Sequence, residues 1–303
     1  MQPLSPHIVQ ILTNDHCVAL AYRTPAGGVA MTPISTIGLH DPQAGTVSFT
    51  SSFGNWKKML RMRQDDRVAL VYHTREHSGL DHPNVVVVQG RASFPDVADG
   101  SWASPETTAR AERFMPAPPT GRFLKWATRE YYDLRVVVTI SIERVIVDHA
   151  DLSAAAASQQ PPAKGTAARV KAGKYRSRWK QCRHFLIGYT DADGFPMVHR
   201  ITPSIDGNDV VFADASLPEG ARRAGFLGHW FQHKLVGQGS VVMTGWLQVD
   251  GRGTARYSPH TCSGYALPPK KAMFHLAGGL ATKFGHRAAV KKGYVRDDVW
   301  VGR

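Results

Sequence analysis

Alternation of apolar and polar residues with a period of two predicts several half-buried β-strands. The clearest stretch is 46–52, where Val47 and Phe49 alternate with Ser48 and Thr50. Similar runs predict further strands at 17–23, 29–39, 68–72, 85–94 and 134–147. One basic helix is expected between the strands 46–52 and 68–72. A helical segment broken by prolines is expected before the strand 134–147. A meander of this kind is typical of a small antiparallel barrel.

The order of elements then repeats. The segment 153–169 is rich in Ala, Gln and Pro and poor in large apolar side chains, which is typical of a linker. Beyond it, a hairpin at 184–202 aligns with the first hairpin, with Tyr189 matching Tyr22 at an offset of 167. We therefore predict a tandem repeat with two domains, at 1–152 and 170–303.

Further elements are predicted in the second copy. Phe212 in the strand 209–216 matches Phe49 of the first copy. The expected elements after it are a helix opened by two arginines at 222–236, a strand at 240–246, a strand at 257–266 as the counterpart of 85–94, and a helix at 270–292 interrupted by two glycines.

Composition and charge narrow the class of protein. A formal net charge of +13 raises nucleic acid as a partner. The basic residues are spread along the chain without a nucleic-acid-binding motif, so this partner is disfavoured against a phosphorylated small molecule. No apolar run reaches the ~20 residues that span a bilayer, and no secretory signal pattern opens the chain. We therefore expect a cytoplasmic protein without a membrane partner.

Cysteine and histidine patterns predict no metal centre. Three widely separated cysteines, without a Cys-x-x-Cys arrangement, are expected to be buried thiols. His229 and His233 have the i, i+4 spacing of metal ligands on a helix, as do His73 and His77, but no Glu adjoins the first histidine of either pair as a zincin motif would require. Fourteen histidines in the chain make such spacings common by chance. The nucleophile elbow, the dinucleotide-binding glycine motif and the Walker loop are also missing from the sequence.

The strongest chemical signal follows the strand 46–52. A turn rich in hydroxyl groups leads through Gly54 and Asn55, an expected N-cap, into a helix whose first turn is basic. A helix N-terminus combines unpaired N–H groups with positive potential, so a phosphate there would meet donors and cations together. The alternative is a surface helix with solvated cations.

This segment resembles the phosphate-binding segment of the pyridoxamine 5′-phosphate oxidase-like split β-barrels, with Asp65-Asp66-Arg67-Val68 in place of the family's usual Asn-Pro-Arg-Val. The resemblance implies a mainly β (α+β) fold of two tandem split β-barrel domains with short flanking helices. Because the family's barrels pair as twofold dimers around the cofactor, it also implies an intrachain pseudo-dimer. A further homodimer is left open. The implied cofactor is FMN, with the deazaflavin F420 as the alternative.

The resemblance implies cofactor-binding residues in both copies. In the first copy they are Thr50, Ser51, Ser52, Asn55, Trp56, Lys57, Lys58 and Gln89. In the second copy they are Arg200, Arg222 and Arg223. Charge favours the first copy, because Asp214 occupies the second turn and a carboxylate 4 Å from a phosphate costs roughly 4 kcal/mol per unit charge at an effective dielectric near 20. The three arginines leave a separate anion site in the second copy open.

The implied function is an FMN- or F420-dependent oxidoreductase that carries out hydride transfer to a small organic substrate. The cofactor would supply the chemistry, so no catalytic side chain is assigned. The alternative is a non-catalytic flavin- or haem-binding protein, such as a sensor or carrier. A basic nucleic-acid-binding module is the third hypothesis.

Overall fold

The computed structural model describes residues 4–148, 158–170, 176–296 and 298–302. The strands of the first half are β1 (Val18–Arg23), β2 (Val29–Ile34), β3 (His40–Asp41), β4 (Thr46–Ser52), β5 (Arg67–Tyr72), β6 (Val86–Ser93) and β7 (Arg135–Val147). Its helices are α1 (Pro6–Asn14), η1 (Phe53–Asn55), α2 (Trp56–Gln64), η2 (Ser101–Ala103), α3 (Pro105–Phe114) and α4 (Arg122–Tyr132). The expected basic helix is thus α2.

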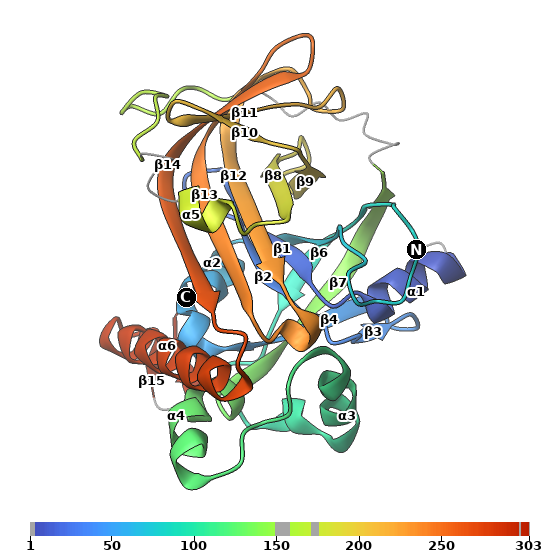
Figure 1. The fold of residues 1–303 in the computed structure, drawn as a ribbon, viewed down its shortest axis with the longest axis vertical. Helices are drawn as coiled ribbons and strands as arrows, with labels where there is room; N and C mark the ends of the chain where they lie inside the picture. Colours follow the sequence, from blue (N-terminus) through green and yellow to red (C-terminus); the bar gives the residue numbers. More distant parts are fainter. Residues whose placement is uncertain (1–3, 149–157, 171–175, 297, 303) are drawn as a thin grey trace.

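The second half follows the same plan with fewer helices (Figure 1). Its strands are β8 (His184–Thr190), β9 (Pro196–Arg200), β10 (Ser204–Asp206), β11 (Asp209–Ala213), β12 (Gly220–Phe231), β13 (Gln238–Val249) and β14 (Thr254–Leu267). The remaining elements are α5 (Arg176–Trp179), η4 (His233–Leu235), α6 (Lys271–Lys291), β15 (Val295–Arg296) and β16 (Val299–Trp300).

The two halves share one strand order. The first sheet runs β2-β1-β5-β6-β7-β4-β3, and the second, read in the same sense, runs β9-β8-β12-β13-β14-β11-β10. Neighbouring strands are antiparallel throughout both sheets. Each strand therefore has its counterpart seven strands later, which confirms the mainly β, tandem architecture predicted from the repeat.

The expected helix at 222–236 is wrong. This stretch forms β12 and the short η4, and β12 is hydrogen-bonded along both edges, to β8 and to β13. Pairing on both sides overrides the local helical pattern, and Gly225 and Gly228 weaken that pattern because glycine is a poor helix former. As a consequence, β13 is the counterpart of β6 and β14 that of β7, so the assignments of 240–246 and 257–266 were each displaced by one strand. His229 and His233 accordingly do not share a helix face.

The first sheet has a hydrophobic core on each of its two faces. Leu20 and Leu70 lie in a core within the first half, together with Phe49 from β4. Their neighbours Ala19 and Val71 point the other way, into a second core that contains side chains from both halves. Strands β1 and β5 are thus buried on both faces, and this explains their continuous apolar runs.

Small residues bring the halves close together. The second core includes Ala19, Ala21 and Ala69 from the first half. A Cβ at Gly225 of β12 would lie only 2.3 Å from the carbonyl oxygen of Val29, so a larger residue there would push β12 away from β2.

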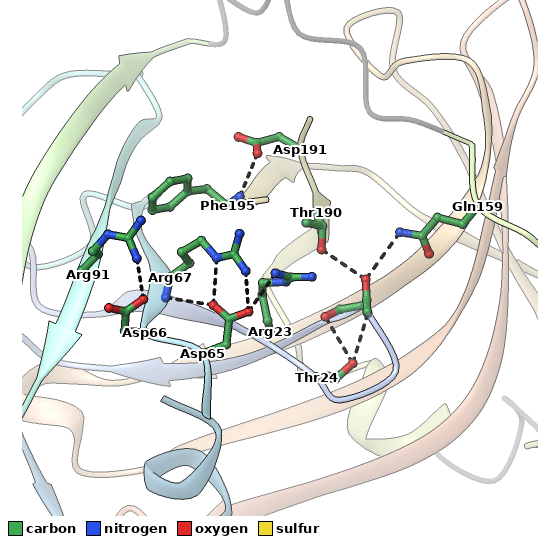
Figure 2. Close-up of polar contacts among 12 residues, drawn as sticks. Arg23, Thr24, Asp65, Asp66, Arg67, Arg91, Gln159, Thr190, Asp191 and Phe195 are labelled. Atoms are coloured by element: carbon green, nitrogen blue, oxygen red, sulfur yellow. Dashed lines mark hydrogen bonds and ion pairs between the residues drawn. The ribbon is translucent and has the colours of Figure 1, made fainter. Parts of the chain in front are cut away.

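A polar seam borders this second core (Figure 2). The carbonyl oxygen of Gly27 accepts hydrogen bonds from Thr190 Oγ1 at 3.3 Å and from Gln159 Nε2 at 3.5 Å. Beside it, Asp65 accepts from both Arg23 and Arg67. The first half thus contacts the second half through apolar packing in the centre and hydrogen bonds at the rim.

Strand register places two equivalent histidines in contact. Tyr22 pairs with Val68 in the first half, and Tyr189 pairs with Ala224 in the second. Five residues beyond Val68 lies His73, and five beyond Ala224 lies His229, so the two histidines are counterparts. Their Nε2 atoms are 2.7 Å apart in the buried region between the halves. The two halves therefore contact each other through residues that occupy equivalent positions in the two sheets.

Part of the predicted linker contacts the second half. Gln159 N donates to the carbonyl oxygen of Ala221, and Arg169 N donates to that of Pro259. The linker residues 153–157 lie outside the described part of the chain.

No helix in the described residues is long and apolar enough to cross a membrane. The described His, Cys, Asp and Glu side chains likewise form no group of three or more that could hold a metal ion.

Candidate functional site

A cavity of about 280 Å³ lies between the two halves, next to the helix α2. The first half contributes residues of β2, β4, α2 and β7, and the second half contributes the ends of β13 and β14 and one side of α6. One end of the cavity is polar and basic, with Thr50, Asn55, Lys58 and Arg135. The other end is largely apolar, with side chains such as Ile34, Met115, Leu235 and Leu267.

The sequence after β4 builds the basic end. Ser52 closes the strand, because its Oγ accepts from Gly54 N at 3.1 Å and donates to the carbonyl oxygen of Glu130 at 2.5 Å. Phe53 is buried in the first core and anchors the turn. Asn55 occupies the N-cap position of α2, but its side chain makes no capping hydrogen bond, so the expected cap is wrong. That side chain lines the cavity instead.

Lys58 and Arg135 face the cavity without a counter-charge. Arg135 is only 7% exposed, and its Nε and Nη1 atoms have no hydrogen-bond partner. Its guanidinium lies over the ring of Tyr131, 4.7 Å from the centroid. Among the described residues, neither cation forms an ion pair with a carboxylate. Burial, reinforced by the charge of Arg135, lowers the pKa of Lys58 to about 7.

The other residues expected at this corner separate into two groups. Trp56 and Lys57 line an adjoining cavity of about 260 Å³, which shares Asn55 and Lys58 with the first cavity. Trp56 stacks on Tyr294 at 5.3 Å, and Lys57 is exposed. Ser51 and Ser52 are buried and line neither cavity.

Gln89 lies in the interface between the halves rather than in the cavity. Its Nε2 donates to Asp191 Oδ2 at 3.1 Å and to the carbonyl oxygen of Pro196 at 2.9 Å. Its Oε1 accepts from Arg144 Nε at 2.7 Å. All of its polar atoms are therefore engaged in joining β6 and β7 to the turn between β8 and β9.

The three arginines of the second copy do not gather. Arg222 is buried, its Nη2 donates to the carbonyl oxygen of Pro218 at 2.8 Å, and its guanidinium lies over the Tyr189 ring. Arg223 points to the opposite face of β12. Arg200 pairs with Leu186, which pairs with Leu227, so Arg200 lies about 17 Å along the sheet from Arg222 at roughly 3.3 Å per residue.

The corner of the second copy that corresponds to the basic end is closed by an acid. Asp214 contacts His199 Nδ1 at 3.3 Å and accepts from Ser216 Oγ at 2.6 Å. Burial alone would raise the pKa of Asp214, but the hydrogen bonds from His199 and Ser216 outweigh it and hold that pKa well below its usual range. An anion would meet a fixed carboxylate there.

Sequence reasoning missed two contributors to the cavity. Arg135 opens β7, and only the register of β7 with β4, which pairs it with Ser52, brings it to the basic end. The helix α6 reaches the same corner from the other end of the chain. A Cβ at Gly285 would lie 2.2 Å from the carbonyl oxygen of Gly54, so glycine allows α6 to touch η1. Neither contact has a local sequence signal.

Another hollow differs in character. It has a volume of about 720 Å³ and lies on the second half beside Trp230 and Pro268. Its cations, Lys180 and Arg183, are exposed to solvent. It therefore has no buried unpaired charge of the kind that distinguishes the interface cavity.

Fold and cavity define a class of protein: two fused antiparallel β-barrel-like units with a cavity between them that is lined by the cations Lys58 and Arg135. No protein-family model matches the chain, and no curated protein matches it. Among solved structures, a conserved hypothetical protein of Mycobacterium tuberculosis is similar, with 19% identity, a TM-score of 0.34, and coverage of 54% of this chain and 94% of its own.

Two further solved structures are similar over a comparable share of the chain. A protein described as an F420 reductase has 15% identity and a TM-score of 0.32, covering 45% of this chain and 93% of its own. A putative pyridoxamine 5′-phosphate oxidase from Listeria innocua has 17% identity and a TM-score of 0.31, covering 46% and 94%. Each similarity spans about half of this chain.

Proposed function

We propose that the interface cavity binds the phosphate end of a flavin-type cofactor, FMN or F420, and that the protein is an oxidoreductase for a small organic substrate. The observation that supports this most directly is the pair of cations, Lys58 and Arg135, facing the cavity without a counter-charge. Two neighbouring cations withdrawn from water repel each other and lose hydration, and no carboxylate in the described chain pairs with either of them.

A phosphate group would fit this end of the cavity chemically. It would supply acceptors for the unpaired Nε and Nη1 of Arg135 and for the Lys58 ammonium, and Thr50 could donate its hydroxyl. Its negative charge would also favour the protonated form of Lys58, whose pKa burial and Arg135 lower to about 7. The residues present therefore match a phosphorylated ligand better than a neutral one.

The rest of the cavity suits an extended ring system. Apolar and aromatic side chains from both halves line it, among them Ile34, Tyr131, Leu267 and Tyr265. When bound, an isoalloxazine or deazaflavin ring would supply the hydride chemistry. The part of this chain would be to bind the phosphate, orient the ring and keep water from it. No side chain is assigned a proton-transfer role.

We propose further that the halves correspond to the two subunits of a twofold dimer, with domains 1–152 and 170–303. The shared strand order and the contact between the equivalent residues His73 and His229 support this. In such an arrangement one chain would complete its own site, because the second half supplies β13, β14 and α6 to the cavity of the first. A further homodimer would then not be needed for binding.

The test is a fluorescence titration of the purified protein with FMN and, separately, with F420. Lys58→Gln and Arg135→Gln each remove a charge-assisted contact of about 1.5 to 3 kcal/mol, so each should weaken binding roughly 10- to 150-fold. Lys57→Gln is the matched control, since it removes an exposed cation one residue away and should change affinity less than about threefold.

Unchanged affinity in the Lys58→Gln/Arg135→Gln double variant would contradict the proposed site. Equal losses in the Lys57→Gln control would mean that general charge, rather than this corner, attracts the ligand. The absorbance spectrum of the protein as purified separates a flavin or deazaflavin from a haem, and substrate-dependent bleaching of that spectrum separates an oxidoreductase from a carrier.

A further inference from the structure

A second feature lies outside the cavity, on the helices α4 and α6, which pack side by side at one end of the molecule (Figure 1). Four large apolar side chains on them are more than half exposed: Phe123 at 64%, Trp126 at 56%, Met273 at 54% and Phe284 at 63%. No other pair of elements in the described chain exposes as much aromatic surface. We call the surface formed by these side chains and the neighbouring cations the α4–α6 face.

The α4–α6 face is strongly and openly basic. Its exposed cations are Arg122, Lys125, Arg129, Lys271, Arg287, Lys291 and Lys292. None of these forms an ion pair in the described structure, whereas arginines elsewhere, such as Arg67, Arg91 and Arg256, are paired with carboxylates. The only acidic residue within the two helices is Glu130, which is already 3.6 Å from Lys283. The face therefore has a concentrated positive charge without internal compensation.

The apolar and basic side chains form one continuous surface. The rings of Phe123 and Trp126 are 6.0 Å apart, and Lys283 Nζ lies 3.7 Å from the centroid of Trp126. Phe284 follows Lys283 directly, and Arg287 is one helical turn further along α6. Aromatic anchors and cations thus alternate across both helices instead of occupying separate patches.

This combination discriminates among possible occupants. A second copy of the chain would bring seven uncompensated cations against seven, so self-association through this face is disfavoured. Single-stranded nucleic acid needs open aromatic faces on which bases stack, but the ammonium of Lys283 lies over the ring of Trp126. An anionic bilayer accepts both features, since Trp and Phe enter the headgroup boundary and Lys and Arg meet lipid phosphates.

We infer that the α4–α6 face docks the protein on an anionic lipid bilayer, lying on its surface without spanning it. The expectation of no membrane partner rested on the lack of a spanning segment, and that lack is compatible with surface attachment. The periodicity of α6 alone does not indicate it, because the exposed aromatic residues come from two helices that only the folded chain brings together.

The experiment is co-flotation of the full-length protein with phosphatidylcholine vesicles, with and without about 30% phosphatidylglycerol. Binding should require the anionic lipid and weaken steeply with added salt. Lys125→Gln/Arg287→Gln/Lys291→Gln and, separately, Phe123→Ser/Phe284→Ser should each lower the partition coefficient at least about tenfold. The matched controls are Lys164→Gln/Arg252→Gln/Lys180→Gln and Val97→Ser/Val301→Ser, exposed residues outside α4 and α6 that should leave partitioning unchanged.

Three results would overturn the inference. The first is a wild-type protein that does not float with anionic vesicles. The second is an equal loss of partitioning in the control variants, which would trace binding to overall charge. The third is retardation of DNA or RNA that the aromatic and basic variants abolish while vesicle binding persists, which would make the face a nucleic-acid surface. Circular dichroism of each variant checks that it is folded, and Phe123 and Phe284 have few contacts to lose.

Discussion

The contact between His73 and His229 makes a specific prediction about stability and pH. The carbonyl oxygen of Val71 lies 3.0 Å from His73 Nδ1 and can only accept, so Nδ1 bears the proton and Nε2 is the acceptor. His229 Nε2 then donates across 2.7 Å, and its Nδ1 faces Cys17 Sγ at 3.9 Å. The hydrogen bonds thus assign both rings as neutral. A further proton on His73 would set two N–H donors against each other.

Acidification is therefore expected to loosen the protein. Burial, reinforced by the charges of His184 and Arg75, lowers the pKa of His73 from 6.5 to about 3. Burial and the neighbouring histidines lower the pKa of His229 well below its ordinary value. The unfolded chain takes up protons on both below pH 6.5, whereas the folded protein does not. Their contribution to stability is present above this pH and is lost as the pH falls from 6.5 towards 3.

The magnitude follows from the same values. For His73 the loss is about 1.4 kcal/mol per pH unit below 6.5, which amounts to about 2 kcal/mol between pH 8 and pH 5. The lowered pKa of His229 adds to this loss in the same direction, so the pair should lower the free energy of unfolding by at least about 2 kcal/mol over this range. Such a loss is a large share of the roughly 5–15 kcal/mol typical of a folded protein.

Denaturant unfolding of the wild type and of a His73→Leu/His229→Leu variant, each at pH 8 and pH 5, measures the contribution of the two histidines to the free energy of unfolding. The double replacement removes both partners of the hydrogen bond between the two rings, and the other titrating groups are common to both proteins. Between pH 8 and pH 5, the wild type should lose at least about 2 kcal/mol more than the double variant. His77→Asn is the control, because Asn tolerates the positive φ of that exposed position. A difference below about 1 kcal/mol would refute the assignment of a neutral buried pair.

Two further predictions concern the cavity. Affinity for FMN should fall by up to about tenfold per pH unit above pH 7.5, because Lys58, with its pKa near 7, loses its charge, and the profile of Lys58→Gln should be flat there. Gly285→Ala should lower both Tm and FMN affinity, because the added Cβ would lie 2.2 Å from the carbonyl oxygen of Gly54. Gly278→Ala is the control. Its Cβ would meet only Leu267, at 4.0 Å, so this variant should leave Tm unchanged or raise it. Thermal melts and titrations of both variants check this pair.

The strands were predictable where a single periodicity dominated. The alternation over β4 and the apolar runs of β5, β6 and β7 identified these strands to within a few residues. The same reasoning failed at β12, because a stretch that begins with two arginines and contains spaced apolar residues fits a helix locally. Only its pairing with β8 and β13 decides otherwise, and the paired residues of β8 lie 35 to 45 positions away in the sequence.

The candidate site was predictable only in part, for a related reason. Lys58, Asn55 and Thr50 stand close together in the sequence, so a local motif could indicate them. Arg135 is brought to them by strand register, and α6 by a helix contact that glycine permits. Gln89 and Arg222 have residue types suited to binding, but burial and hydrogen bonding commit them to the scaffold. Residue type alone does not distinguish these uses.

Fusion of the two copies into one chain explains why their corners differ. In a twofold dimer of identical chains, both anion corners must have the same sequence. Here fourteen residues, including α2, separate β4 from β5, but only six separate β11 from β12, which leaves no room for a helix bearing a counterpart of Lys58.

Asp214 and His199 occupy that corner in the second copy, and the second copy contributes instead to the cavity beside the first copy. It does so by extending α6 across η1 and by lining the apolar end of the cavity. The two copies thus differ in charge and in helices: the first copy provides the basic corner with α2, and the second copy covers that corner with α6. Under the proposed function, this arrangement predicts one cofactor per chain rather than the two that a symmetric pair would hold.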